Sequence, residues 1–132
     1  MKSILTRQTA TWGILLILSP MIIFHLLVLS GIIPFHIVWG GRLSNRQEMI
    51  QFESISLLSL LTMIFIVSVY AGFVPLWIKP IILKAVLWLM ALLFLLNTLG
   101  NLNAVDPLER NLFTPATLLL FIFSLRLALA RD

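Results

Sequence analysis

The sequence predicts an all-α fold, an antiparallel four-helix bundle that crosses a membrane four times, up-down-up-down. Most of the 132 residues lie in four long apolar runs, at about 11–33, 52–74, 80–100 and 113–130. Each run is close to the ~20 residues that a helix needs to cross about 30 Å of hydrocarbon. The chain is 61% hydrophobic and 11% charged, whereas about a quarter of a soluble domain is charged. We therefore expect a single transmembrane domain over residues 1–132.

The distribution of basic residues predicts the orientation of this bundle. Four spans put both tails and the middle loop on one side of the membrane, and that side holds six of the nine basic residues: Lys2, Arg7, Lys79, Lys84, Arg126 and Arg131. Short basic segments stay in the cytoplasm, so we expect both termini there. The basic residues are scattered singly, without a run or an aromatic-interleaved stripe, which argues against a nucleic-acid partner.

The first span, 11–33, is expected to be uncleaved, because its apolar part exceeds 20 residues and has no small-x-small cleavage site at its end. Pro20 removes one backbone donor and should bend the helix. We expect the helix to end at Pro34.

A capping box, Ser44-Asn-Arg-Gln47, predicts that the second helix begins in water at residue 45 and enters the membrane near Phe52. Glu53 then lies only ~13 Å along that helix, at the outer boundary. The Gly40-Gly41 pair before it suits a tight turn in the head-group zone.

The later elements are bounded by proline and by a second capping signature. Gly72, Pro75 and Pro80 confine the turn that leads to the third span. Asp106-Pro-Leu-Glu109 places Asp at a helix cap and Pro at the first helical position, which predicts a short interfacial helix over about 107–112. The fourth span then starts at Thr114-Pro115.

Polar residues gather at the outer end of the predicted bundle, because the first and third loops lie on the same side. The candidate pocket there consists of Arg42, Arg46, Glu53, Asn97, Asn101, Asp106 and Arg110. Such a pocket could bind a small polar or anionic group; the alternative is that capping residues and interfacial charges simply collect at this face. Glu53 is the deepest acid, and we expect Arg42 or Arg46 to be its partner.

His25 is the titratable residue inside the first span. It is either a buried histidine that is hydrogen-bonded to a neighbouring helix or a member of a proton relay. A pairing with Glu53 would have to bridge a difference in depth, because His25 lies nine residues before Pro34, ~13 Å below the surface. Asn97 and Asn101 either bond across helices or contact a substrate.

Several kinds of chemistry are not expected. The chain has no cysteine, so disulfides, thiolate metal sites and iron–sulfur clusters are excluded. His25 and His36 are eleven residues apart, with no further ligand at metal-binding spacing, so we expect no metal and no cofactor. No nucleophile with a base and oxyanion donors can be assembled, which disfavours an enzyme.

Four segments carry a resemblance to known proteins: Ile37-Val-Trp-Gly-Gly-Arg42, Asn97-Thr-Leu-Gly-Asn101, Leu108-Glu109 and Phe113-Thr-Pro115. Together they resemble a group of small bacterial four-span membrane proteins that carry no assigned activity. The resemblance implies a bacterial inner membrane. In size the chain is also similar to small multidrug resistance transporters, four-helix dimers that depend on an acid in the middle of helix 1, where this chain offers only His25.

Two functions follow as expectations. The first is a non-catalytic accessory or interaction protein of the inner membrane, which recognises a lipid head group or a membrane-protein partner at its outer pocket. The alternative is a small transporter that works as a homo-oligomer and uses Glu53 or His25 for proton or substrate coupling.

The predicted orientation can be tested by labelling. Single cysteines placed at residues 3 and 131 of the full chain should both be inaccessible to a membrane-impermeant maleimide in intact cells and become reactive after lysis. A cysteine at residue 45 should react in intact cells. Labelling of the two terminal cysteines from opposite sides would contradict the four-span topology.

Overall fold

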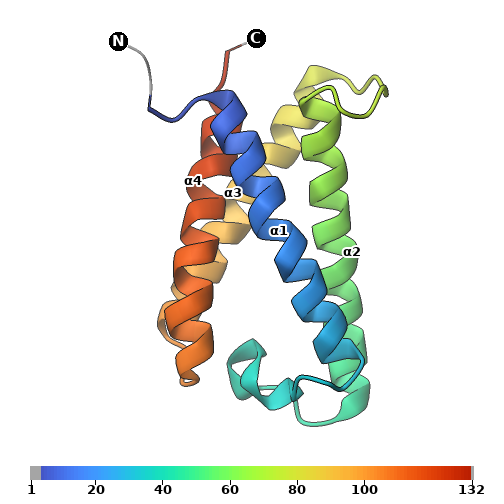
Figure 1. The fold of residues 1–132 in the computed structure, drawn as a ribbon, viewed down its shortest axis with the longest axis vertical. Helices are drawn as coiled ribbons and strands as arrows, with labels where there is room; N and C mark the ends of the chain where they lie inside the picture. Colours follow the sequence, from blue (N-terminus) through green and yellow to red (C-terminus); the bar gives the residue numbers. More distant parts are fainter. Residues whose placement is uncertain (1–3, 132) are drawn as a thin grey trace.

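A computed structural model describes residues 4–131 and is all-helical, with no strand in that part of the chain. Its long helices are α1 (Arg7–Leu29), α2 (Arg46–Tyr70), α3 (Pro80–Leu102) and α4 (Thr114–Ala128). A turn of π-helix, η3 (Glu109–Phe113), leads directly into α4, and four helices, counting η3 with α4, are long and apolar enough to cross a membrane. The predicted antiparallel order is confirmed, because successive helices run in opposite directions (Figure 1).

The bundle has two ends, and the chain divides its loops between them. At the termini end, α1 begins, α4 ends and the 71–79 loop joins α2 to α3. At the loop end lie residues 30–45, between α1 and α2, and residues 103–108, between α3 and η3.

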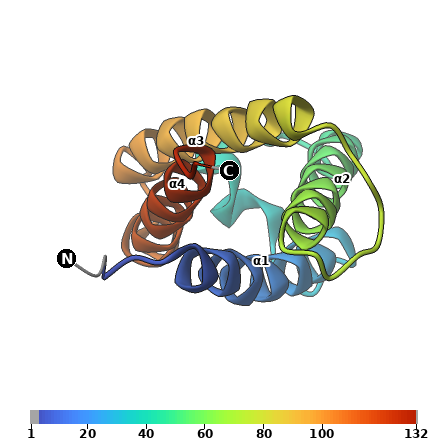
Figure 2. The same cartoon turned by 90° about the horizontal axis from the view of Figure 1, so that it is seen from above.

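The helices pack unequally around the bundle. α1 packs against both α2 and α4, and α3 packs mainly along α4, whereas α2 and α3 have the smallest contact among neighbouring helices (Figure 2). Gly13 lets α1 approach α4 closely, because a Cβ there would lie 2.3 Å from the ring of Phe123. Small residues permit such approaches between membrane helices. The seam between α2 and α3 is therefore the least closed side of the bundle.

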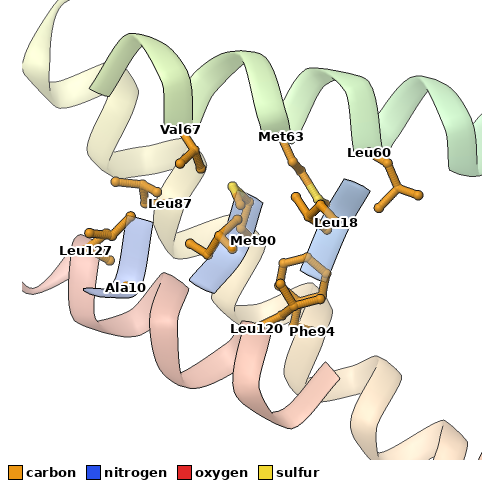
Figure 3. Packing of buried hydrophobic residues seen from close by; sticks show 12 residues of the cluster. Ala10, Leu18, Leu60, Met63, Val67, Leu87, Met90, Phe94, Leu120 and Leu127 are labelled. Carbon is orange, nitrogen blue, oxygen red and sulfur yellow. The ribbon is translucent and has the colours of Figure 1, made fainter. Parts of the chain in front are cut away.

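The main core lies between all four helices (Figure 3). It joins Leu18 of α1, Val67 of α2, Leu87 and Phe94 of α3, and Leu120 of α4, each at most 1% exposed. The outer faces of the same helices are also apolar, and they carry exposed side chains on every helix, such as those of Leu16, Leu58, Leu92 and Leu118. Apolar side chains on both the inner and the outer faces suit a bundle surrounded by hydrocarbon.

Helix α1 ends at Leu29, so the expected end just before Pro34 is wrong by four residues. Gly31 has a φ of +88°, which breaks the helix, and Ser30 caps it by donating its N–H to the carbonyl of Leu26. Ile33, which directly precedes Pro34, is also disfavoured in the helical backbone conformation. As a result His25 lies only four residues, or ~6 Å, from the end of its helix.

Helix α2 begins one residue later than expected. Asn45 rather than Ser44 is the N-cap, and its side chain accepts the N–H of Glu48 at 2.9 Å. Glu48 in turn accepts from the backbone N–H of Ser44 at 3.1 Å. The side chains of Asn45 and Glu48 thus accept the backbone N–H groups of Glu48 and Ser44, with Glu48 in the place where Gln47 was expected.

The short separate helix predicted over 107–112 is instead continuous with α4 through the π turn η3. Pro115 has no N–H and cannot bond to the carbonyl four residues before it, and a wider turn accommodates this loss. The predicted cap is present, because Asp106 Oδ1 accepts the N–H of Leu108 at 2.8 Å.

The first loop folds back under the bundle. Its two short 3-10 turns, η1 (Phe35–Ile37) and η2 (Trp39–Gly41), lie beneath the space that the helices enclose (Figure 2). Val38 and Leu43 are buried against Val28 of α1 and Met49 of α2. This packing holds the first loop, residues 30–45, across the loop end of the bundle. We call this loop the floor.

Candidate functional site

A buried carboxylate forms the centre of the candidate site. Glu53 on α2 is 0% exposed, and both of its oxygens are bonded. Oε2 pairs with Nδ1 of His25 on α1, and Oε1 accepts the indole N–H of Trp39 in the floor at 3.0 Å. The three side chains therefore join two helices and the first loop.

The pairing of Glu53 with Arg42 or Arg46 is wrong. Both arginines are exposed, and the ion pair of the described residues joins Glu53 to His25. The expected difference in depth between Glu53 and His25 is small, because α1 ends early: His25 lies ~6 Å from its helix end and Glu53 lies ~10 Å from the start of α2. Burial favours this arrangement, since a carboxylate away from water needs hydrogen-bond donors from the protein.

Trp39 holds an uncommon backbone conformation. Its φ is 55°, the left-handed region, which costs a bulky residue of order 1–3 kcal/mol. The indole N–H bond to Glu53 and the packing of the ring on Phe52, with centroids 5.0 Å apart, offset this cost. Strain of this kind persists only where its surroundings fix it, and here the contact with Glu53 does so.

Nδ1 of His25 and Oε2 of Glu53 are joined by a hydrogen bond, which uses one of the two ring nitrogens of His25. Within residues 4–131 the second ring nitrogen, Nε2, has no hydrogen-bond partner, and the His25 side chain is 16% exposed. Glu53 thus orients His25 and leaves Nε2 available to a ligand.

A cavity of about 460 Å³ lies beside His25 in the loop-end half of the bundle. All four helices and the floor contribute to its walls. The polar residues that line it are His25, Trp39, Arg42, Ser56, Ser59, Asn97, Asn101, Glu109 and Thr117. Its apolar walls include Met63 and Phe94 from the core.

The cavity opens along the seam between α2 and α3. Ile55 and Leu96 line it, yet their side chains are 63% and 54% exposed, so they lie at its mouth. Asn97 also lies at this mouth; it is exposed and has no hydrogen-bond partner in the described part of the chain.

The structure separates the residues that the sequence had grouped. Arg42, Asn97 and Asn101 line the cavity, and Glu53 lies behind its His25 wall. Arg46 and Arg110 are exposed on the outer surface, and Asp106 serves as a helix cap. Asn101 bonds across helices to Oγ1 of Thr117 at 3.4 Å.

One residue of the site, Trp39, was not predicted from the sequence, although its place directly before the Gly40-Gly41 pair could have indicated a fixed turn. Glu109, which the second capping signature places at the outer end, is 5% exposed, lines the cavity and begins the π turn η3. Such π turns are frequent at functional sites.

The site can accept and donate hydrogen bonds. Residues 4–131 contain no group of three His, Cys, Asp or Glu side chains arranged to hold a metal ion. His25, Asn97 and Arg42 offer an imidazole nitrogen, an amide and a guanidinium along one cavity. This set suits the recognition of a polar group attached to an apolar body.

Removing the indole donor tests the buried cluster. Trp39→Phe keeps an aromatic ring but leaves Oε1 of Glu53 buried without a donor, so the free energy of unfolding in detergent should fall by about 1–3 kcal/mol. In the Glu53→Leu background the same substitution should cost clearly less, and denaturant titration followed by circular dichroism measures both. Equal costs in the two backgrounds would show that Trp39 stabilises the protein independently of Glu53.

The cluster, the floor and the cavity thus form one continuous site in the loop-end half of the bundle. Comparison of the chain with known proteins finds no matching family model, no matching curated protein and no matching solved structure.

Proposed function

We propose that this chain is a multi-pass protein of a bacterial inner membrane, with both termini in the cytoplasm, that binds a small amphiphile in the loop-end cavity without converting it. Its role is then that of an accessory protein that holds or presents this ligand. A volume of about 460 Å³ falls within the usual 300–1,000 Å³ of ligand sites.

The observation that carries the proposal is the mouth between α2 and α3. It lies in a helical seam with apolar residues on its rim, so a ligand enters from the lipid side. The amide of Asn97 at the mouth and Nε2 of His25 inside have no partners within residues 4–131. A polar group on the ligand would satisfy both, and its apolar part would lie against Phe94 and Met63.

Filling the cavity tests this function without disturbing the fold. Gly100 lines the cavity, and a Cβ added there meets nothing within 4 Å. Gly100→Leu should therefore leave the fold intact, or stabilise it, because glycine costs a helix about 1 kcal/mol relative to alanine. Native mass spectrometry of protein extracted from its own membranes should show a small bound molecule on the wild type and little or none on Gly100→Leu.

Leu99→Phe is the matched control, because Leu99 is the neighbouring residue, is 50% exposed and does not line the cavity. It should retain the bound molecule at the wild-type level. A wild type that carries no small molecule after gentle extraction, or a molecule that persists on Gly100→Leu, would contradict ligand binding in this cavity.

Transport is the second candidate, favoured by one observation. His25 and Glu53 form a hydrogen-bonded pair of titratable side chains inside the bundle, and His25 lines a cavity, as a proton-coupling site requires. A single bundle of this size leaves little room for a pore, so the transporter would be an oligomer of this chain.

Proton flux separates the two candidates. In proteoliposomes with a pH-sensitive dye inside, a transporter should dissipate an imposed pH gradient, and Glu53→Gln should abolish that flux because the titratable carboxyl group is lost. Arg46→Gln, on the exposed surface, is the control and should behave as the wild type. Absence of flux in wild-type proteoliposomes that retain the bound amphiphile would rule against transport and favour the accessory role.

A further inference from the structure

A second cavity, of about 640 Å³, lies at the termini end, remote from the cluster around Glu53. It is bounded by the first turns of α1, the last turn of α2, the 71–79 loop and the start of α3. It shares no lining residue with the loop-end cavity.

The charge around this cavity is positive. Arg7 and Lys84 line it, and none of its ten lining residues is an acid. The four acids of the described residues, Glu48, Glu53, Asp106 and Glu109, all lie in the loop-end half. An anion that enters here therefore meets two cations and no nearby carboxylate from the described chain.

Lys84 is held in place by the end of α4. Its ammonium group donates to the carbonyls of Leu127, Ala128 and Ala130, the last carbonyls of that helix region. Three carbonyls use its three donors, so Lys84 supplies a fixed positive charge to the cavity wall rather than a direct hydrogen bond. Arg7 is exposed, and its guanidinium is the fork that suits phosphate oxygens.

Tyr70 supplies a polar atom without a partner. Its hydroxyl is buried and makes no hydrogen bond within residues 4–131, although Tyr70 lines the cavity. A buried hydroxyl left unsatisfied costs free energy. A phosphate oxygen in the cavity would accept a hydrogen bond from this hydroxyl and remove this cost.

The remaining wall is apolar and reaches the outer surface. Trp12 and Phe73 pack with ring centroids 5.4 Å apart, and they are 47% and 53% exposed. Tryptophan at the end of a span lies at the level of the lipid head groups. The cavity thus combines a cationic interior with an aromatic rim at head-group depth.

From this combination we propose that the termini-end cavity binds the phosphate group of a negatively charged phospholipid. Arg7 and Tyr70 hold the phosphate oxygens, Lys84 provides a fixed charge, and the glycerol and acyl chains leave past Trp12 and Phe73. Free phosphate has the same chemistry at its polar end but gains nothing from the aromatic rim.

The test uses the full chain stripped of lipid in an uncharged detergent. Dihexanoyl phosphatidylglycerol, dihexanoyl phosphatidylcholine and inorganic phosphate are titrated separately, and the melting temperature is followed by circular dichroism. Phosphatidylglycerol should raise the melting temperature most. Arg7→Gln should weaken its apparent affinity about fivefold, the size expected for one cation beside an anionic head group.

Tyr70→Phe gives a readout that a purely structural role would not. Without lipid it should melt at or above the wild-type temperature, because it removes an unpartnered buried hydroxyl, yet its affinity for phosphatidylglycerol should fall several-fold. Arg110→Gln, an exposed basic residue at the loop end that lines neither cavity, is the matched control and should keep the wild-type affinity.

Equal affinity for phosphatidylglycerol in the wild type, Arg7→Gln and Tyr70→Phe would overturn the proposed site. Stabilisation by inorganic phosphate at the same concentrations as by phosphatidylglycerol would overturn its assignment to a lipid. Equal stabilisation by phosphatidylcholine would overturn the requirement for a net negative head group.

Discussion

The burial of the Glu53 carboxylate is the constraint on which the loop-end half of the structure depends. A carboxylate that is 0% exposed inside a helical bundle must receive hydrogen bonds from neighbouring side chains. His25 and Trp39 provide them, and each brings a different part of the chain to α2. Trp39 reaches Glu53 only because the first loop folds under the bundle with a left-handed residue at its turn. The floor and the cavity above it therefore both depend on the position of one acid.

Unequal helix packing explains why a cavity remains at all. Gly13 brings α1 close to α4, and α3 packs along α4, so α2 and α3 are left with few contacts. The core of Figure 3 closes the middle of the bundle, whereas the two cavities lie toward its ends. The cavities differ in charge: the loop-end cavity includes both Arg42 and Glu109, and the termini-end cavity has cations alone. The two ends of the same bundle are thus suited to different polar groups.

The sequence could predict part of the site because depth follows from position along a helix. It placed Glu53, Asn97, Asn101 and Arg42 at the same end, and the structure finds three of them in the cavity wall and Glu53 directly behind it. The sequence could not identify the partner of Glu53. Arg46 and Arg42 are seven and eleven residues away in the chain, whereas His25 lies on another helix. That choice required the position of the end of α1, which lies at Leu29, five residues before Pro34, because Gly31 breaks the helix.

By itself the sequence determined four apolar helices, their order and their approximate bounds, because hydropathy and length are properties of each segment alone. The capping signatures near residues 45 and 106 could also be read from the sequence, because each cap is formed by residues that are close together in the chain. Only the tertiary structure decided that Trp39 donates a hydrogen bond to Glu53 and that α2 and α3 make few contacts. It also decided that Asn101 bonds to Thr117, whereas Asn97 lies at the mouth of the cavity. Each of these depends on the relative rotation and spacing of helices, and almost uniformly apolar segments carry little amphipathic pattern from which that rotation could be read.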